Sequence, residues 1–296
     1  MEFRSFNDKE VIEYNFQSMS DFLDYILTQP INTEVFSELS SAREDEGSIE
    51  FTKTKTFEEA VNLCKFGYFE NFDKFYRDKI VLEPYITTDG VELKTRNDYI
   101  GHFPDIKAYM EGSPLSMFNK IPSPKNKISI YYCVGMSGAD DEKIIHNRGV
   151  ITLNIIEAFE RLGYSVDFHL FDLAKDYYIA SQYLLINFLL KKENERINPQ
   201  LLYYPMCHPS FTRRLLFRLT EQTPNISEGF SSGYGCRCSL DEMQEVLGVD
   251  NKRIIVGWSQ DMDVKGKDLI EDAEAMINTI NERNMQKTLK MPVFKG

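Results

Sequence analysis

The segment Lys-Ile-Ser-Ile-Tyr-Tyr-Cys-Val-Gly-Met at residues 127–136 decides the fold that we expect for this chain. It is rich in β-branched and aromatic residues, as buried strands are, and a turn of Gly, Ser and Asp follows it. Residues 144–162 then place apolar side chains at helical spacing, Gly163 stands where a C-terminal cap belongs, and residues 164–171 return to a strand pattern. The order strand, helix, strand predicts a parallel sheet covered by helices, with any ligand site at the turn 135–141.

The C-terminal half continues this alternation. Residues 182–192 fit a buried strand or a short helix, because so short an apolar run has no decisive period. Further strand and helix patterns cover residues 200–222, interrupted at Pro205 and Pro209, residues 239–248, which open with a Ser239–Glu242 capping box, and residues 253–258 and 267–283. We therefore expect an α/β fold in which residues 127–296 form a Rossmann-like or von Willebrand A-like three-layer domain.

The N-terminal half carries weaker patterns. Residues 19–28 predict a capped amphipathic helix, and Thr56 with Glu59 predicts a capping box for a second one. The polar residues 40–49 predict a loop. From residue 68 to 126, aromatic residues, including Tyr99 and Phe103, are scattered among Gly and Pro without a sustained period. We expect residues 1–126 to be an irregular α+β region or arm, whose aromatic side chains either pack a core or line a partner-binding surface.

Composition bounds the classes of partner. The 34 Lys and Arg residues against 46 Asp and Glu residues give a net charge of -12, which repels phosphate backbones and disfavours direct nucleic-acid binding. The N-terminus lacks the apolar core of a signal peptide, and no apolar run approaches the roughly 20 residues of a membrane span. The five cysteines, an odd number in a long chain, favour reduced thiols. These features predict a cytoplasmic protein.

The turn at residues 135–141 lacks the sequence of a phosphate loop or a dinucleotide-binding loop. It is similar to a degraded von Willebrand A metal site, which uses Asp-x-Ser-x-Ser after the first strand. Gly135 and Ala139 occupy the Asp position and the last Ser position, so only Ser137 remains. One hydroxyl cannot hold a cation that requires several oxygen ligands. We therefore expect a structural turn and no metal.

The cysteine-rich loop at residues 233–238, with the sequence Gly-Tyr-Gly-Cys-Arg-Cys, is the best candidate for contact with a partner. Glycines let a backbone approach another surface, and Tyr and Arg are favoured interface anchors. Cys236 and Cys238, with Cys207 and His208, are an alternative set of zinc ligands, although their spacing matches no common zinc motif. Free thiols in a loop are the simpler interpretation.

No catalytic residue is predicted. His146 falls on a helix and His169 in a strand, and no Ser, His and Asp set or cysteine nucleophile motif is recognisable. Residues 208–210 and the Arg213-Arg214 pair are candidates for anion binding or simply for a helix start. The acidic stretches at residues 140–142 and 271–274 are typical of solvated helix faces, or alternatively imitate a phosphate backbone.

Four segments together resemble a widespread family of bacteriophage proteins with a degraded von Willebrand A-like core, and within it the Gabija anti-defense proteins. The segments are FTKTKTFEEA at residues 51–60, IIHNRG at 144–149, PSFTRR at 209–214 and GYGCRC at 233–238.

This resemblance implies a non-enzymatic inhibitor without a cofactor. Such proteins form homo-oligomers in the host cytoplasm around the host Gabija defense complex, with its nuclease and helicase-like subunits, and block its DNA binding and cleavage. By resemblance and by chemistry together, the contacts with this complex or between protomers are assigned to Tyr234, Cys236, Arg237, Cys238, Tyr99 and Phe103. The alternatives are a metal- or nucleotide-binding α/β enzyme acting through the turn 135–141 and a phage structural or assembly protein.

Overall fold

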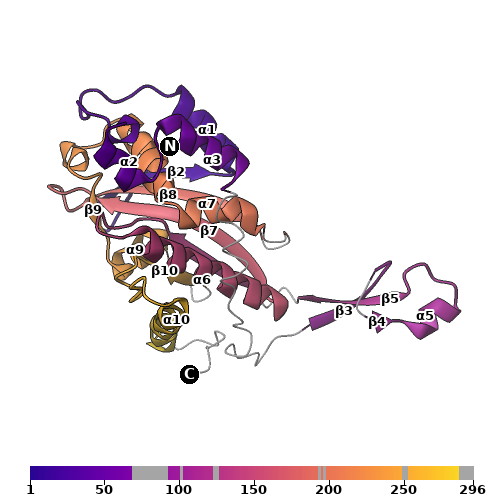
Figure 1. The fold of residues 1–296 in the computed structure, drawn as a ribbon. Coiled ribbons are helices and arrows are strands. Elements are labelled where there is room, and N and C mark those ends of the chain that lie inside the picture. Colours follow the sequence, from indigo (N-terminus) through magenta and orange to yellow (C-terminus); the bar gives the residue numbers. More distant parts are fainter. Residues whose placement is uncertain are drawn as a thin grey trace.

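The computed structural model describes residues 1–68, 93–100, 103–122, 127–192, 195, 198–248 and 253–286. A mixed β-sheet with helices packed on it forms the body (Figure 1). Its strands follow the order β1 (Glu2–Phe6), β2 (Lys9–Phe16), β8 (Gln182–Lys191), β7 (Ser165–Lys175), β6 (Lys127–Cys133) and β10 (Arg253–Val256), and the short β9 (Cys236–Arg237) pairs with the end of β7. The predicted α/β fold class is confirmed.

The strand-helix-strand unit at the centre is confirmed as well. Strands β6 and β7 are parallel neighbours joined by α6 (Glu142–Arg161), and β10 runs parallel to β6 on its other side. Residues 182–192 form a strand, β8, which is antiparallel to β7. The connection over residues 176–181 is too short for a crossover helix, so the chain must turn back and the sheet is mixed rather than purely parallel.

The expected division of the chain at residue 126 requires a correction. Strands β1 and β2 belong to the same sheet as the C-terminal strands, since β2 pairs in parallel with β8. Val11, Ile12 and Tyr14 are buried in the common hydrophobic core. Residues 1–68 are therefore part of the α/β body, because the backbone of β2 pairs with β8 and its apolar side chains lie in the common core.

Helices of both halves surround this sheet (Figure 1). The remaining helices of the body are α1 (Met19–Thr28), α2 (Glu46–Thr52), α3 (Phe57–Phe66), α7 (Pro199–Cys207), the π-helical segment η3 (Phe211–Leu216), α8 (Phe217–Gln222), α9 (Leu240–Leu247) and α10 (Leu269–Gln286), with short 3₁₀ turns η1 (Ser40–Ala42) and η4 (Glu228–Ser231). The Ser239–Glu242 capping box is present, and the Thr56 hydroxyl accepts from the backbone of Glu59.

Helix α2 corrects the expectation of a loop at residues 40–49. Asp45 caps its first turn by accepting from the backbone N–H of Ser48, and Lys53 ends it in a left-handed conformation. The segment is almost entirely polar, so an apolar period could not reveal it. Its position matters because α2 forms one wall of the candidate site described below.

A second, three-stranded antiparallel sheet lies to one side of the body in Figure 1. It consists of β3 (Leu93–Asp98), β5 (Met117–Pro122) and β4 (Phe103–Pro104), with the short helix α5 (Ile106–Met110) between β4 and β5. We refer to residues 93–100 and 103–122 as the small sheet. The other residues of the expected irregular arm, 69–92, 101–102 and 123–126, lie outside the described part of the chain.

Buried arginines connect the segments that surround the sheet. The fully buried Arg214 donates to four backbone carbonyls, those of Ser41, Arg43, Thr54 and Lys55, and to the hydroxyl of Thr54. These acceptors lie on either side of α2. Because a buried guanidinium needs partners for its N–H groups, Arg214 fixes the chain before and after α2.

The same arrangement recurs at the turn after β6. The buried Arg148 of α6 donates to the carbonyls of Gly135 and Gly257 and to the hydroxyl of Tyr132. The end of β6 and the end of β10 are thus tied to the same side chain.

We predict that Arg214→Ala lowers the free energy of unfolding by at least about 3 kcal/mol, because it leaves several buried carbonyls without a donor. Urea denaturation followed by circular dichroism measures this change. Arg43→Ala is the matched control, since its exposed side chain forms an ion pair with the exposed Glu38, and it should cost less than about 1 kcal/mol. Equal costs for the two variants would contradict the role given to Arg214.

Candidate functional site

The carboxyl ends of the parallel strands β6, β7 and β10 meet at one edge of the sheet, where open α/β sheets bind ligands. Gly135, Asp172 and Trp258 lie there. A Cβ atom added to Gly135 would lie 2.8 Å from Asp172 Oδ1 and 2.9 Å from Trp258 Nε1. Any side chain at position 135 would therefore displace one of these groups, so only glycine allows both to pack this closely against the backbone.

A cavity of about 580 Å³ opens at this edge, and we call it the Trp258 cavity. Gly135, Asp172 and Trp258 form its floor at the strand ends, α2 contributes Phe51, and Tyr234 and Cys236 of the cysteine-rich loop close it on another side. Its size is within the range of cavities that hold small organic ligands.

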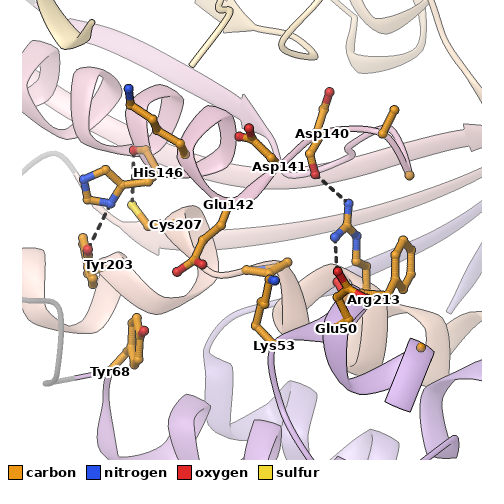
Figure 2. Close-up of a pocket in the computed structure, with 16 residues that line it drawn as sticks. Glu50, Lys53, Tyr68, Asp140, Asp141, Glu142, His146, Tyr203, Cys207 and Arg213 are labelled. Carbon is orange, nitrogen blue, oxygen red and sulfur yellow. Dashed lines mark hydrogen bonds between the residues drawn. The ribbon is translucent and has the colours of Figure 1, made fainter. Parts of the chain in front are cut away.

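A second cavity of about 840 Å³ adjoins it, with Phe51, Arg213 and two glycines lining both. We call it the His146 cavity (Figure 2). Figure 2 shows Tyr203 and Cys207 beside His146 at one end and Arg213 at the other. The acidic residues in its lining outnumber the basic ones; they are Glu50, Asp140, Asp141 and Glu142 against Lys53, Lys143 and Arg213.

Arg213 separates the two cavities. Its terminal nitrogens donate to the carbonyls of Phe51 at 2.6 Å, Ser137 at 3.0 Å and Asp140 at 3.1 Å, and its guanidinium lies 4.0 Å from the centre of the Phe51 ring. Burial lowers the pKa of Arg213 to about 10. The side chain stays charged at neutral pH, and it joins α2 to the turn after β6.

Two N–H donors that line the Trp258 cavity have no acceptor in the described part of the chain. They are Trp258 Nε1 and Arg213 Nε, both shielded from solvent. A buried donor without a partner costs about 1 to 3 kcal/mol, so each such group calls for an explanation.

Asp172 supplies a carboxylate to the same cavity. Asp172 is partly exposed as a residue, but protein atoms surround its carboxyl group. This burial raises the pKa of the carboxyl group to about 6. The N–H of Leu173 and the charge of Arg148 act in the opposite direction and only partly offset the burial. A carboxyl group whose pKa is raised towards neutral pH is typical of functional sites.

Asp140 is occupied by its own turn. Its carboxylate accepts from the N–H of Ser137, the hydroxyl of Ser259 and the amide of Gln260. Within the described residues, no three or more His, Cys, Asp and Glu side chains are grouped to hold a metal. The zinc alternative thus receives no support, and the described cysteines are free thiols.

The prediction that Tyr234 contacts a partner requires a correction, because its side chain makes contacts within the protein. Its ring stacks on Phe217 with centroids 3.8 Å apart, its hydroxyl donates to Glu221 at 2.6 Å, and it accepts from the N–H of Ser40 at 3.0 Å. With these contacts used inside the protein, Tyr234 anchors the loop to the body and lines the Trp258 cavity. Flanking glycines in a sequence do not distinguish such an inward-facing Tyr from an exposed one.

The other three contact residues predicted in the cysteine-rich loop differ in how exposed they are. Cys238 is fully buried, which corrects its assignment to a surface, and burial raises the pKa of its thiol. Cys236 is half-buried in β9 and lines the Trp258 cavity. Arg237 is exposed, pairs with Asp261 and lies 6.0 Å from the Trp258 ring centre. Among the predicted contact residues of this loop, Arg237 is the exposed one, whereas Tyr234 and Cys236 are partly buried and Cys238 is buried.

Tyr99 and Phe103 lie in the small sheet, and both side chains are exposed, as a contact with a partner would require. Tyr99 is 70% and Phe103 57% exposed. Other large apolar side chains of the small sheet are also exposed, namely Ile100, Ile106, Tyr109 and Met110. We call this set the small-sheet patch.

Sequence reasoning missed Asp172 and Trp258. The predicted strand 164–171 stopped one residue before Asp172, and Trp258 was placed at the end of the strand 253–258 without a role. The usable signal was their position. Asp172 lies near the carboxyl end of β7 and Trp258 follows β10, and the carboxyl ends of these parallel strands converge at one edge.

Together these features define an α/β protein with cavities at the carboxyl edge of its sheet. The chain belongs to the family described as Domain of unknown function (DUF7192), whose model matches residues 5–284. No curated protein and no solved structure matches the chain significantly. Of the helices in the described ranges, none has both the length and the apolar composition needed to cross a bilayer.

The raised pKa of Asp172 predicts a pH-dependent cost to stability. The unfolded carboxyl ionises near pH 4, whereas the folded one ionises near pH 6, so the folded state is destabilised as the pH rises through this window. The amide of Asn does not ionise in this pH range, so the substituted chain lacks this pH dependence. We therefore expect the free energy of unfolding of Asp172→Asn, relative to the unsubstituted chain, to rise by about 2 kcal/mol from pH 4.5 to pH 7.5.

Urea denaturation at the two pH values measures this difference, with Asp263→Asn as the control because the Asp263 side chain is 61% exposed. The control should show the same difference at both pH values. A pH-independent difference for Asp172→Asn would contradict the assignment.

Proposed function

We propose that this chain acts by binding another protein, as a phage inhibitor of the bacterial Gabija complex. The small-sheet patch carries this proposal, because it exposes several large apolar side chains on one small unit. Clusters of this kind mark interaction sites on proteins, and Tyr is among the residues that dominate binding energy.

Two further features support a protein partner over DNA itself. The net charge of -12 repels a phosphate backbone at long range. The small sheet also lies outside the main body in Figure 1, where a partner can reach it without disturbing the core. The inhibitor therefore would prevent DNA cleavage by occupying the nuclease and helicase-like assembly.

The identity of the partner and the homo-oligomeric state rest on the resemblance of four segments to Gabija anti-defense proteins. In that family, protomers enclose the complex and block its DNA binding and cleavage. With Tyr234 and Cys238 held inside this fold, the patch and Arg237 take over the contacts assigned to them.

The test mixes the purified chain with a Gabija complex and measures the mass of the product by size-exclusion chromatography with light scattering. We expect a stable complex heavier than either component and loss of DNA cleavage by the nuclease. The double variant Tyr109→Ser, Met110→Ser should weaken association at least tenfold, because it removes two side chains that are 73% and 81% exposed.

Tyr178→Ser is the matched control, since Tyr178 is 71% exposed but lies in the turn between β7 and β8. It should bind as the unsubstituted chain does. Failure of the unsubstituted chain to associate would overturn the Gabija proposal. Association that the double variant leaves intact would overturn the role of the patch.

A further inference from the structure

The Trp258 cavity has the features of a ligand site, independently of the inhibitor proposal. We propose that it binds a nucleobase with a lactam edge, such as uracil or guanine, whose carbonyl accepts from Trp258 Nε1 and whose ring N–H donates to Asp172. A carbonyl beside an N–H is the group that an adjacent donor and carboxylate recognise together.

The geometry at the strand ends supports this pairing. Asp172 and Trp258 both line the cavity, and Asp172 Oδ1 and Trp258 Nε1 converge on Gly135, each within 3 Å of the position that a Cβ would occupy there. Trp258 Nε1 has no hydrogen-bond partner among the residues that the structure describes. A ligand edge that reaches both groups from the cavity satisfies the orphaned donor and gives the carboxylate a hydrogen bond that favours its charged form.

The walls suit a flat, aromatic ligand. The stacked rings of Tyr234 and Phe217 line the cavity, as do Phe51 and Trp258 itself. The unpartnered Nε of Arg213 offers a second donor for an oxygen elsewhere on the ligand. At about 580 Å³ the cavity can hold a nucleoside.

The charges favour a neutral nucleoside over a nucleotide. Arg148 and Arg213 are balanced by Asp172 and Asp140 near the cavity, and the lining of the adjoining His146 cavity holds more acidic than basic residues. A phosphate group would be repelled on that side, so the base and not a phosphate is recognised.

Trp258 is the only tryptophan of the sequence, so its fluorescence reports on this cavity alone. Uridine and guanosine are titrated into the full chain at neutral pH, with isothermal calorimetry as the second readout. We expect a saturable change in emission with a Kd below about 1 mM. The analogues 3-methyluridine and 1-methylguanosine, which lack the ring N–H, should bind at least tenfold more weakly.

Three variants locate the site by calorimetry. Trp258→Phe removes the indole N–H, Asp172→Ala removes the carboxylate, and Gly135→Ala displaces one or both of these groups. Each should weaken uridine or guanosine binding at least tenfold. Asp263→Ala, at an exposed carboxylate outside the cavity, is the control and should bind normally.

Circular dichroism and urea denaturation first establish that each variant is folded. Absence of binding by both nucleosides would overturn the proposal. So would equal binding of the methylated analogues, or binding that survives both Trp258→Phe and Asp172→Ala in folded protein.

Discussion

The structure depends on buried guanidinium groups that donate to backbone carbonyls. Arg148, Arg213 and Arg214 are each at least 95% buried, and their bonds to protein are mainly to main-chain oxygens. A loop carbonyl cannot be left unpaired inside a protein, and a buried cation cannot be left without acceptors. Each arginine gives loop carbonyls a donor and gains acceptors for its own N–H groups. These bonds fix irregular segments much as backbone pairing fixes strands in a sheet.

This constraint explains why the cavities lie where they do. Arg148 fixes the ends of β6 and β10, Arg214 fixes the chain on both sides of α2, and Arg213 joins α2 to the turn after β6. Because the arginine side chains hold these segments in place, the segments can line a cavity at the sheet edge without closing it. This arrangement has a cost in stability, because the carboxyl group of Asp172 and the indole N–H of Trp258 are desolvated at the sheet edge.

The sequence predicted those elements whose signals are local. The strand, helix and strand of residues 127–171 and the cap at Ser239 depend on neighbouring residues, and the structure has them. The union of β2 with β8 could not be predicted in this way, because it joins residues more than 160 positions apart. Tyr234 was mistaken for an exposed anchor for the same reason, since its partners Phe217 and Glu221 come from a helix that the loop sequence does not contain.

The central claim is that the proposed contact with a protein partner is formed mainly by the small sheet, and not by Tyr234 and Cys238 of the cysteine-rich loop. Hydrogen–deuterium exchange of the chain, alone and with a Gabija complex, tests it most directly. We expect new protection in residues 97–118, while the amides of residues 233–236 keep the exchange rates of the free chain. Protection confined to the loop, or none in the small sheet when the complex has formed, would contradict it.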